Sequence, residues 1–236
     1  MTAVIVAVLV VLVTSAVQGA VGFGMNLLAV PVLVLVDPRL VPGPVLLAGL
    51  ALAFLVAVRE REPLERQLGW ALLGLVPGTA AALTLLSLVP PDALGLPMGV
   101  LVLLAVMLSA LRLELSPTPP SLSVAGTASG FLATAAGIGG PPLALLYARA
   151  PGPRLRGNLS GFFVVTAAVS LLALVLTGHF GLRDLRLSLP LVVGALAGFV
   201  ASGPLRSVVD RGHTRGAVLL LSAAAALVAI GEGLRS

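Results

Sequence analysis

Apolar runs that contain almost no charged residue follow one another along nearly the whole chain of 236 residues. Ten runs can be distinguished, at about 2–20, 22–36, 41–58, 67–88, 94–111, 122–136, 138–149, 157–178, 185–206 and 216–234. A helix needs roughly 20 apolar residues to cross the hydrocarbon core of a bilayer. Six runs are long enough for this, namely 41–58, 67–88, 94–111, 157–178, 185–206 and 216–234. The pattern predicts an all-α integral membrane protein with about 8–10 membrane segments.

The composition agrees with a chain that lies almost entirely in a membrane. Hydrophobic residues make up 58% and charged residues 10% of the chain, whereas a soluble domain carries about 25% charged residues. We therefore expect a single membrane domain over 1–236. Cysteine is absent, which excludes disulfides and thiolate metal sites. The arginines are not clustered and aromatic residues make up only 4% of the chain, so nucleic acid is not an expected partner.

Two of the apolar stretches, 2–36 and 122–149, are interrupted by glycines near their middle. A shift of 115 residues places Gly22-Phe23-Gly24 on Gly137-Ile138-Gly139 and Pro38-Arg39-Leu40 on Pro153-Arg154-Leu155. A further adjustment of five residues places Gly74 and Gly78 on Gly194 and Gly198. We interpret the chain as two repeats, 1–112 and 122–236, joined by a proline-rich linker at 113–121. Each repeat is expected to contain a glycine-broken helical hairpin followed by three transmembrane helices.

The arginines predict how the two repeats are oriented. If each broken hairpin enters and leaves on one side, ten arginines fall on one side: Arg59, Arg61, Arg66, Arg112, Arg149, Arg154, Arg156, Arg206, Arg211 and Arg215. Four fall on the other: Arg39, Arg183, Arg186 and Arg235. A single kinked crossing for each hairpin would divide the arginines seven against seven. Because cytoplasmic loops are enriched in arginine, the first arrangement is favoured. It makes the repeats inverted, with both termini outside and the linker in the cytoplasm.

The broken helices indicate where a function would be located. Backbone without helical hydrogen bonds is tolerated at membrane depth only where it is buried in protein or lines a cavity. Discontinuous helices at matching positions of inverted repeats are typical of the binding site of a secondary transporter. The helix that follows each break, beginning near Gly24 and near 139–142, would present free N–H groups and a positive dipole end to an anion.

Polar side chains flank the same two breaks. Gln18 and Asn26 lie near the first, and Ser129, Thr134 and Asn158 near the second. Glycines in membrane helices often serve only close packing, but their paired occurrence favours a site. The candidate substrate-binding residues are Gln18, Gly22, Phe23, Gly24, Asn26, Thr134, Gly137, Gly139, Gly140, Pro141 and Asn158. No catalytic constellation, metal site or cofactor is expected.

Proton coupling would need an unusual acceptor, because no ionisable residue lies well inside an apolar run. Asp37 and Glu232 are found at the edges of such runs. If protons are coupled to transport, they are carried either by an edge residue or by the substrate anion itself.

Two motifs resemble the signatures of a known family. They are Gln18-Gly19-Ala20-Val21-Gly22-Phe23-Gly24 with Pro31, and Gly130-Phe131-Leu132 through Gly137-Ile138-Gly139-Gly140-Pro141-Pro142 with Arg156-Gly157-Asn158. Both are similar to the sulfite exporter TauE/SafE family of small bacterial permeases. The resemblance implies a protein of the bacterial cytoplasmic membrane that moves sulfite, sulfoacetate or other organosulfonates, often outward. Met25-Asn26-Leu27 stands where the second half has Gly140-Pro141-Pro142, so the two half-sites need not contribute equally.

Two other functions fit the same features. The breaks could form the filter of an anion channel, or they could pack against a partner in a non-transporting membrane assembly subunit. A homodimer is compatible with the sequence. An intramembrane enzyme is the least supported, because no nucleophile with an adjacent base is recognisable.

Overall fold

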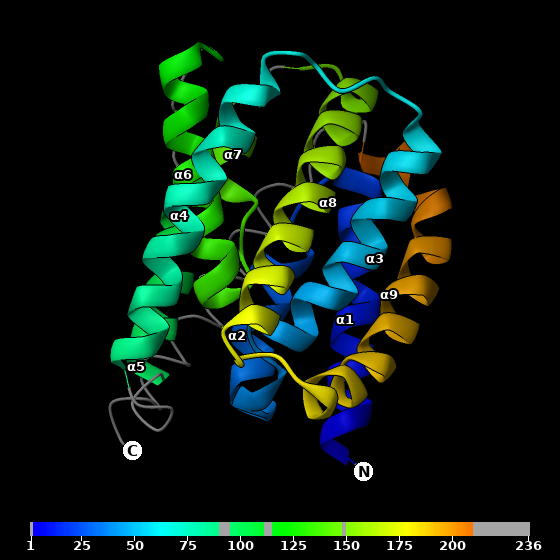
Figure 1. Ribbon diagram of the computed structural model, residues 1–236. Coiled ribbons are helices and arrows are strands. Elements are labelled where there is room, and N and C mark those ends of the chain that lie inside the picture. The colour runs from blue at the N-terminus through cyan, green and yellow to red at the C-terminus, as the bar shows by residue number, and fades with distance from the viewer. Residues whose placement is uncertain (1, 90–94, 111–114, 148–149, 210–236) are drawn as a thin grey trace.

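The computed structural model describes residues 2–89, 95–110, 115–147 and 150–209, and these residues form helices without any strand. The elements are α1 (Thr2–Val21), α2 (Met25–Val36), the short 3-10 helix η1 (Pro38–Leu40), α3 (Gly43–Glu60), α4 (Leu68–Leu88), α5 (Gly95–Ala110), α6 (Pro119–Ala136), α7 (Pro141–Leu146), α8 (Gly152–Leu176) and α9 (Leu182–Val209). Figure 1 shows them as a bundle in which the long helices run roughly along one direction. The predicted all-α fold is confirmed.

Five helices, α1, α3, α4, α8 and α9, are long and apolar enough to cross a membrane. Large apolar side chains such as Leu73, Val76 and Val200 are exposed on them, as expected for a surface in contact with lipid. Helices α3, α4, α8 and α9 match four of the six predicted spans, namely 41–58, 67–88, 157–178 and 185–206. The fifth, 94–111, corresponds to α5, of which the structure describes Gly95–Ala110. The predicted span 216–234 lies outside the described residues.

Both glycine breaks lie where the sequence places them. Helix α1 ends at Val21 and α2 begins at Met25, while α6 ends at Ala136 and α7 begins at Pro141. Gly24 has φ 118° and Gly137 has φ 77°. These left-handed values are open to glycine without steric cost, so the two residues turn the chain back on itself. Helix α7 has only six residues, much fewer than the apolar run 138–149.

The boundary of the proline-rich linker differs from the prediction. Residues 119–121 belong to α6 and not to the linker 113–121, which therefore ends at Thr118. The Thr118 and Ser121 side chains form a reciprocal capping box, and proline is well accommodated in the first turn of a helix. Two prolines of the predicted linker, Pro119 and Pro120, are therefore the first residues of α6.

Helices from the two halves of the sequence pack against one another. Helix α4 packs along α6, α1 packs along α9, and α3 contacts both α8 and α9. The glycines that the shifted alignment equates lie in these interfaces. A side chain at Gly74 or Gly78 would collide with the backbone of α6, and one at Gly194 or Gly198 with the backbone of α1. The α4–α6 and α1–α9 pairs are therefore held at close range by equivalent small residues.

The two ends of the bundle differ in the arginines that they carry. The α3–α4 connection crosses the upper end in Figure 1, and the α8–α9 connection lies at the lower end, near the start of α1. Of the described arginines up to position 186, five belong to the segments at the α3–α4 end, namely Arg59, Arg61, Arg66, Arg154 and Arg156, and three belong to those at the α8–α9 end, namely Arg39, Arg183 and Arg186.

The close contact between α4 and α6 generates a first prediction. Gly78→Val would place a branched side chain against the carbonyl of Thr127 and should lower the free energy of unfolding by about 1–3 kcal/mol, the usual cost of overpacking. Gly198→Val should act similarly at the α1–α9 contact. The measurement is thermal unfolding of the purified protein in detergent. Gly69→Val is the control, since nothing lies within 4 Å of a side chain there; equal melting temperatures for all three variants would contradict the prediction.

Candidate functional site

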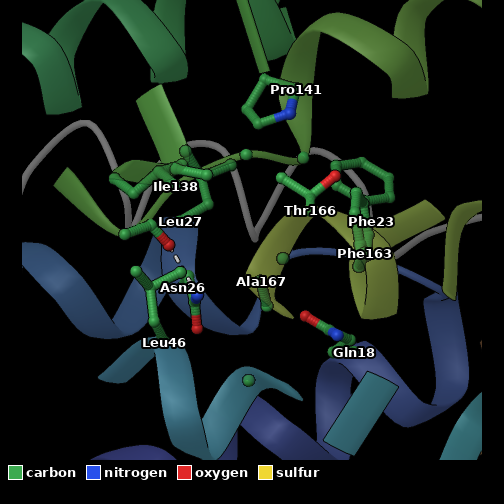
Figure 2. Close-up of a pocket in the computed structure, with 16 residues that line it drawn as sticks. Gln18, Phe23, Asn26, Leu27, Leu46, Ile138, Pro141, Phe163, Thr166 and Ala167 are labelled. Carbon is green, nitrogen blue, oxygen red and sulfur yellow. Dashed lines mark hydrogen bonds between the residues drawn. The ribbon is translucent and has the colours of Figure 1, made fainter. Parts of the chain in front are cut away.

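A small cavity lies between the two glycine breaks (Figure 2). Its volume is about 50 Å³, and a water molecule needs about 10–15 Å³ on this scale, so it has room for a few non-hydrogen atoms. Its walls come from α1, α2, α3, α6, α7, α8 and the two breaks. The lining residues are Gln18, Phe23, Gly24, Asn26, Leu27, Leu46, Gly49, Ala133, Gly137, Ile138, Gly139, Gly140, Pro141, Phe163, Thr166 and Ala167. None of these side chains is charged.

Asn26 connects the two breaks directly. Its Nδ2 donates a hydrogen bond to the carbonyl oxygen of Gly137 at 2.6 Å (Figure 2). Its Oδ1 is buried and has no hydrogen-bond partner among the described residues. The absence of a side chain at Gly49 makes room for this amide, because a Cβ there would lie 3.1 Å from Nδ2. One side chain from the first half therefore fixes the backbone of the second half at the cavity.

Gln18 organises the start of α2. Its Oε1 accepts a hydrogen bond from the backbone N–H of Met25 at 2.9 Å, which satisfies the first free donor of that helix. Figure 2 shows the amide of Gln18 pointing toward Ala167 on α8. Of the two polar groups of this amide, the oxygen is thus engaged by the protein, and the Nε2 donor is the group available to a ligand.

The backbone donors at the two breaks are not equivalent. At the first, Gln18 occupies the Met25 amide, so Asn26 and Leu27 carry the next N–H groups of α2. At the second, the first two residues of α7 are prolines and have no N–H. The amides near that part of the cavity therefore come from the two glycines before α7, Gly139 and Gly140, more than from the helix itself.

Eight of the eleven predicted binding residues line the cavity, and Gly22, Thr134 and Asn158 do not. Thr134 is fully buried between helices, with its hydroxyl 2.8 Å from that of Ser170 and 3.4 Å from that of Thr79. Asn158 binds the α3–α4 connection: its Oδ1 accepts a hydrogen bond from the Glu65 N–H at 3.0 Å. Both residues therefore stabilise the arrangement of the helices around the site.

A comparison with protein families identifies the chain. The family model described as Sulfite exporter TauE/SafE matches residues 7–229. The chain belongs to the sulfite exporter TauE/SafE family. No curated protein and no solved structure matches it. This TauE/SafE protein is accordingly a multi-pass membrane permease of a transporter family, and sulfur-containing anions are the cargo that the family name indicates.

Sequence reasoning missed half of the residues that line the cavity. Gly49, Phe163, Thr166 and Ala167 come from α3 and α8, which the apolar pattern describes only as membrane spans. A glycine such as Gly49 can indicate that another side chain approaches the helix closely, but this side chain belongs to Asn26, which lies 23 positions away in the sequence. A helical contact of this kind is set by the rotation of each helix about its axis, and uniformly apolar runs do not define that rotation.

Glu65 anchors the α3–α4 connection at the end of the bundle. Its carboxylate accepts hydrogen bonds from Arg154 Nε at 2.6 Å, from the Tyr147 hydroxyl at 3.2 Å and from Gln67. Burial raises the pKa of Glu65, but the hydrogen bonds from Arg154 and Gln67 and the charge of Arg154 outweigh it and hold the pKa below its usual value. The connection is therefore bound to the start of α8 by an ionised carboxylate.

This lowered pKa predicts how stability changes with pH. Ionised Glu65 stabilises the fold above about pH 4.5, and this contribution is lost as the pH falls through the lowered pKa. Glu65→Gln should therefore melt at a lower temperature than the wild type at pH 7, and the difference should shrink as the pH falls below about 4.5 and through the lowered pKa. Glu62→Gln, at an exposed neighbouring position, is the control and should show a much smaller effect. A Glu65→Gln deficit of constant size across this range would contradict the assignment.

Proposed function

We propose that this chain is a secondary transporter that exports a small sulfur-containing anion, with sulfite the best fit, across the bacterial cytoplasmic membrane by alternating access. The observation that carries the proposal is the cavity between the two glycine breaks, to which both halves of the chain contribute. Family membership supports the class of cargo. The volume of about 50 Å³ has room for one central atom with three oxygens.

The donors around the cavity suit an anion. The Gln18 amide nitrogen, the amides of Gly139 and Gly140, and the first turn of α2 place N–H groups and a helix N-terminus at its wall. Uncharged donors can hold an oxyanion while still allowing its release. The apolar side chains of Phe23 and Phe163 form part of the remaining wall.

The packing of the helices supports an arrangement of two inverted repeats. The pairs α1–α9 and α4–α6 are equivalent under the shifted alignment, and both use matching glycines. In our proposal, the packed pairs α1–α9 and α4–α6, each of which contains one helix from repeat 1–112 and one from repeat 122–236, move relative to one another and expose the cavity alternately to each side. The arginine-rich α3–α4 end is the cytoplasmic end, in keeping with the positive-inside rule.

A proton, if coupled, would travel on the substrate. The Asp37 carboxylate accepts hydrogen bonds from the Arg39 side chain at 2.8 and 2.7 Å. These bonds hold the pKa of Asp37 below its usual value against the opposing effect of burial, so this edge carboxylate is a poor proton acceptor. Sulfite and bisulfite interconvert near neutral pH, and Asn26 offers a buried acceptor oxygen for a substrate that carries a proton.

Transport into proteoliposomes tests the proposal directly. Purified protein should give saturable flux of radiolabelled sulfite, and Gly139→Leu should remove most of it. A Cβ at Gly139 would lie 3.0 Å from the Cβ of Ala133 and 3.3 Å from Thr166, so a leucine there would fill the cavity. Gly69→Leu is the matched control, because that position faces open space. Equal flux for the wild type and Gly139→Leu would refute the assigned site, and single-channel currents without saturation would favour a channel.

Asn26→Asp tests whether the cargo is an anion. The substitution keeps the size of the side chain, removes the donor to Gly137 and adds a negative charge beside the cavity. Because like charges repel strongly in a site of low dielectric constant, the KM for sulfite should rise by at least about tenfold at neutral pH. Asn26→Leu removes the same hydrogen bond without adding the charge. It should affect KM less than Asn26→Asp, and the reverse order would argue against an anionic cargo.

A further inference from the structure

The α3–α4 connection, residues 61–67, is an extended strap that crosses the arginine-rich end of the bundle above α8 (Figure 1). It leaves α3 at Arg61, whose left-handed φ of 55° turns the chain out of the helix. Five of its seven residues are exposed, whereas Glu65 and Gln67 are half-buried. The strap therefore lies on the bundle as a separate layer and not within the apolar core.

Two glycines of α8 form the surface on which the strap lies. A side chain at Gly157 would collide with Glu62, and one at Gly161 would collide with Leu64. These glycines are four residues apart and therefore share one face of the helix, which lets the extended chain approach α8 closely. Because Glu62 and Leu64 are exposed, the strap can separate from α8 without breaking up the core.

Glu65 holds the strap in place. Its carboxylate accepts hydrogen bonds from Arg154 and Tyr147, and its backbone N–H donates one to Asn158. Arg154 and Asn158 belong to the first turns of α8, and Tyr147 directly follows α7, the short helix after the second break. These three contacts, the Glu65 latch, bond the strap to both elements that follow this break along the chain.

A cluster of buried apolar side chains extends from the latch to the cavity. It includes Tyr147 and Leu68, which adjoin the latch and the end of the strap, and Phe23, which lines the cavity. Phe163, a second lining residue, packs against the same cluster. A passage from the cavity to the α3–α4 end would therefore require these side chains to separate.

The strap connects helices that belong to different packed groups. Helix α3, which precedes it, packs against α8 and α9, whereas α4, which follows it, packs most extensively along α6. The proposed transport cycle moves the pairs α1–α9 and α4–α6 relative to one another. Such a movement changes the distance that the strap spans or the place at which it is held on α8, so the Glu65 latch would respond to it.

We propose that the strap 61–67 is the gate at the cytoplasmic end of the cavity and that Glu65 fastens it. With the Glu65 latch formed, as in this structure, the apolar cluster stays packed between the cavity and the α3–α4 end. When the latch breaks, Tyr147 and the start of α8 are released from the strap, and the cluster opens. This role rests on the proposed function, in which the cavity faces each side of the membrane in turn.

The Glu65 latch is suited to breaking and forming again in each transport cycle. The side chain of Arg154 is 57% exposed, and an exposed ion pair is weak because water competes with it. The glycine contacts between α4 and α6, by contrast, join closely packed backbones, and their many short contacts would all be lost together. This difference places the movement at the strap and not within the packed pair.

Thiol labelling of the cavity tests the gate without any transported substrate. The chain contains no cysteine, so Ala167→Cys places a single thiol in the cavity wall. In inside-out vesicles, a membrane-impermeant methanethiosulfonate should label this thiol about fivefold faster when Glu65→Gln is added, because loss of the ion pair shifts the equilibrium toward the open gate. In right-side-out vesicles, the labelling rate should stay the same or fall.

Glu62→Gln is the matched control, since it removes a carboxylate from the same strap but none of the bonds of the Glu65 latch. It should label at the rate of Ala167→Cys alone. An unchanged labelling rate in Glu65→Gln would overturn the gate, and so would a rate that rises from both faces, as in a bundle that is loosened as a whole.

A disulfide that fixes the strap gives a second test if Glu65→Gln does not fold. In Leu64→Cys/Gly161→Cys the two thiols are adjacent, because a side chain at Gly161 meets Leu64. Oxidation should abolish sulfite flux in proteoliposomes and dithiothreitol should restore it, whereas the oxidant should not change the flux of either single variant. Full flux through the cross-linked pair, or failure of the two thiols to cross-link, would overturn the gate. Absence of sulfite flux in the wild type, together with the expected labelling pattern, would overturn the proposed cargo and leave the gate intact.

Discussion

The backbone that leaves the helices inside the bundle must still find hydrogen-bond partners, and the structure around the cavity follows from that constraint. Water is scarce at membrane depth, so an unpaired N–H or C=O there is costly. Asn26 satisfies the carbonyl of Gly137, Gln18 satisfies the first amide of α2, and two arginines satisfy carbonyls at the end of α1. Side chains thus replace the missing helical partners, and polar groups collect where the chain is broken.

This replacement couples the halves of the molecule. The hydrogen bond from Asn26 to Gly137 joins α2 to the second break, whereas glycine contacts bind α4 to α6 and α1 to α9 over much of their length. Close helix packing resists sliding, because its many short contacts would all be lost together. A movement that opens the cavity is therefore expected to rearrange the contacts at the breaks and to keep the two packed pairs intact.

The sequence alone predicts the breaks well, because a left-handed turn at Gly24 or Gly137 demands glycine and leaves a visible mark in an apolar run. It predicts the polar partners poorly. Thr134 and Asn158 were assigned to the site by proximity along the chain, yet they bond to Ser170 and Glu65. The ion pairs that Arg59 and Arg156 form with Glu60 were missed because each arginine stands beside a connection, where a solvated arginine is the ordinary expectation. Only tertiary structure brings them to the same carboxylate.

The uncharged lining of the cavity bears on how a carrier releases its cargo. A guanidinium inside the cavity would bind an oxyanion by short, bidentate hydrogen bonds and hold it tightly. A transport site needs affinity that favours entry but does not prevent exit, as in ion filters. The wall of the cavity instead has Gln18, Asn26 and Thr166 as its polar side chains, and all three are uncharged. In the proposed transporter, these weaker uncharged groups determine how long the anion stays.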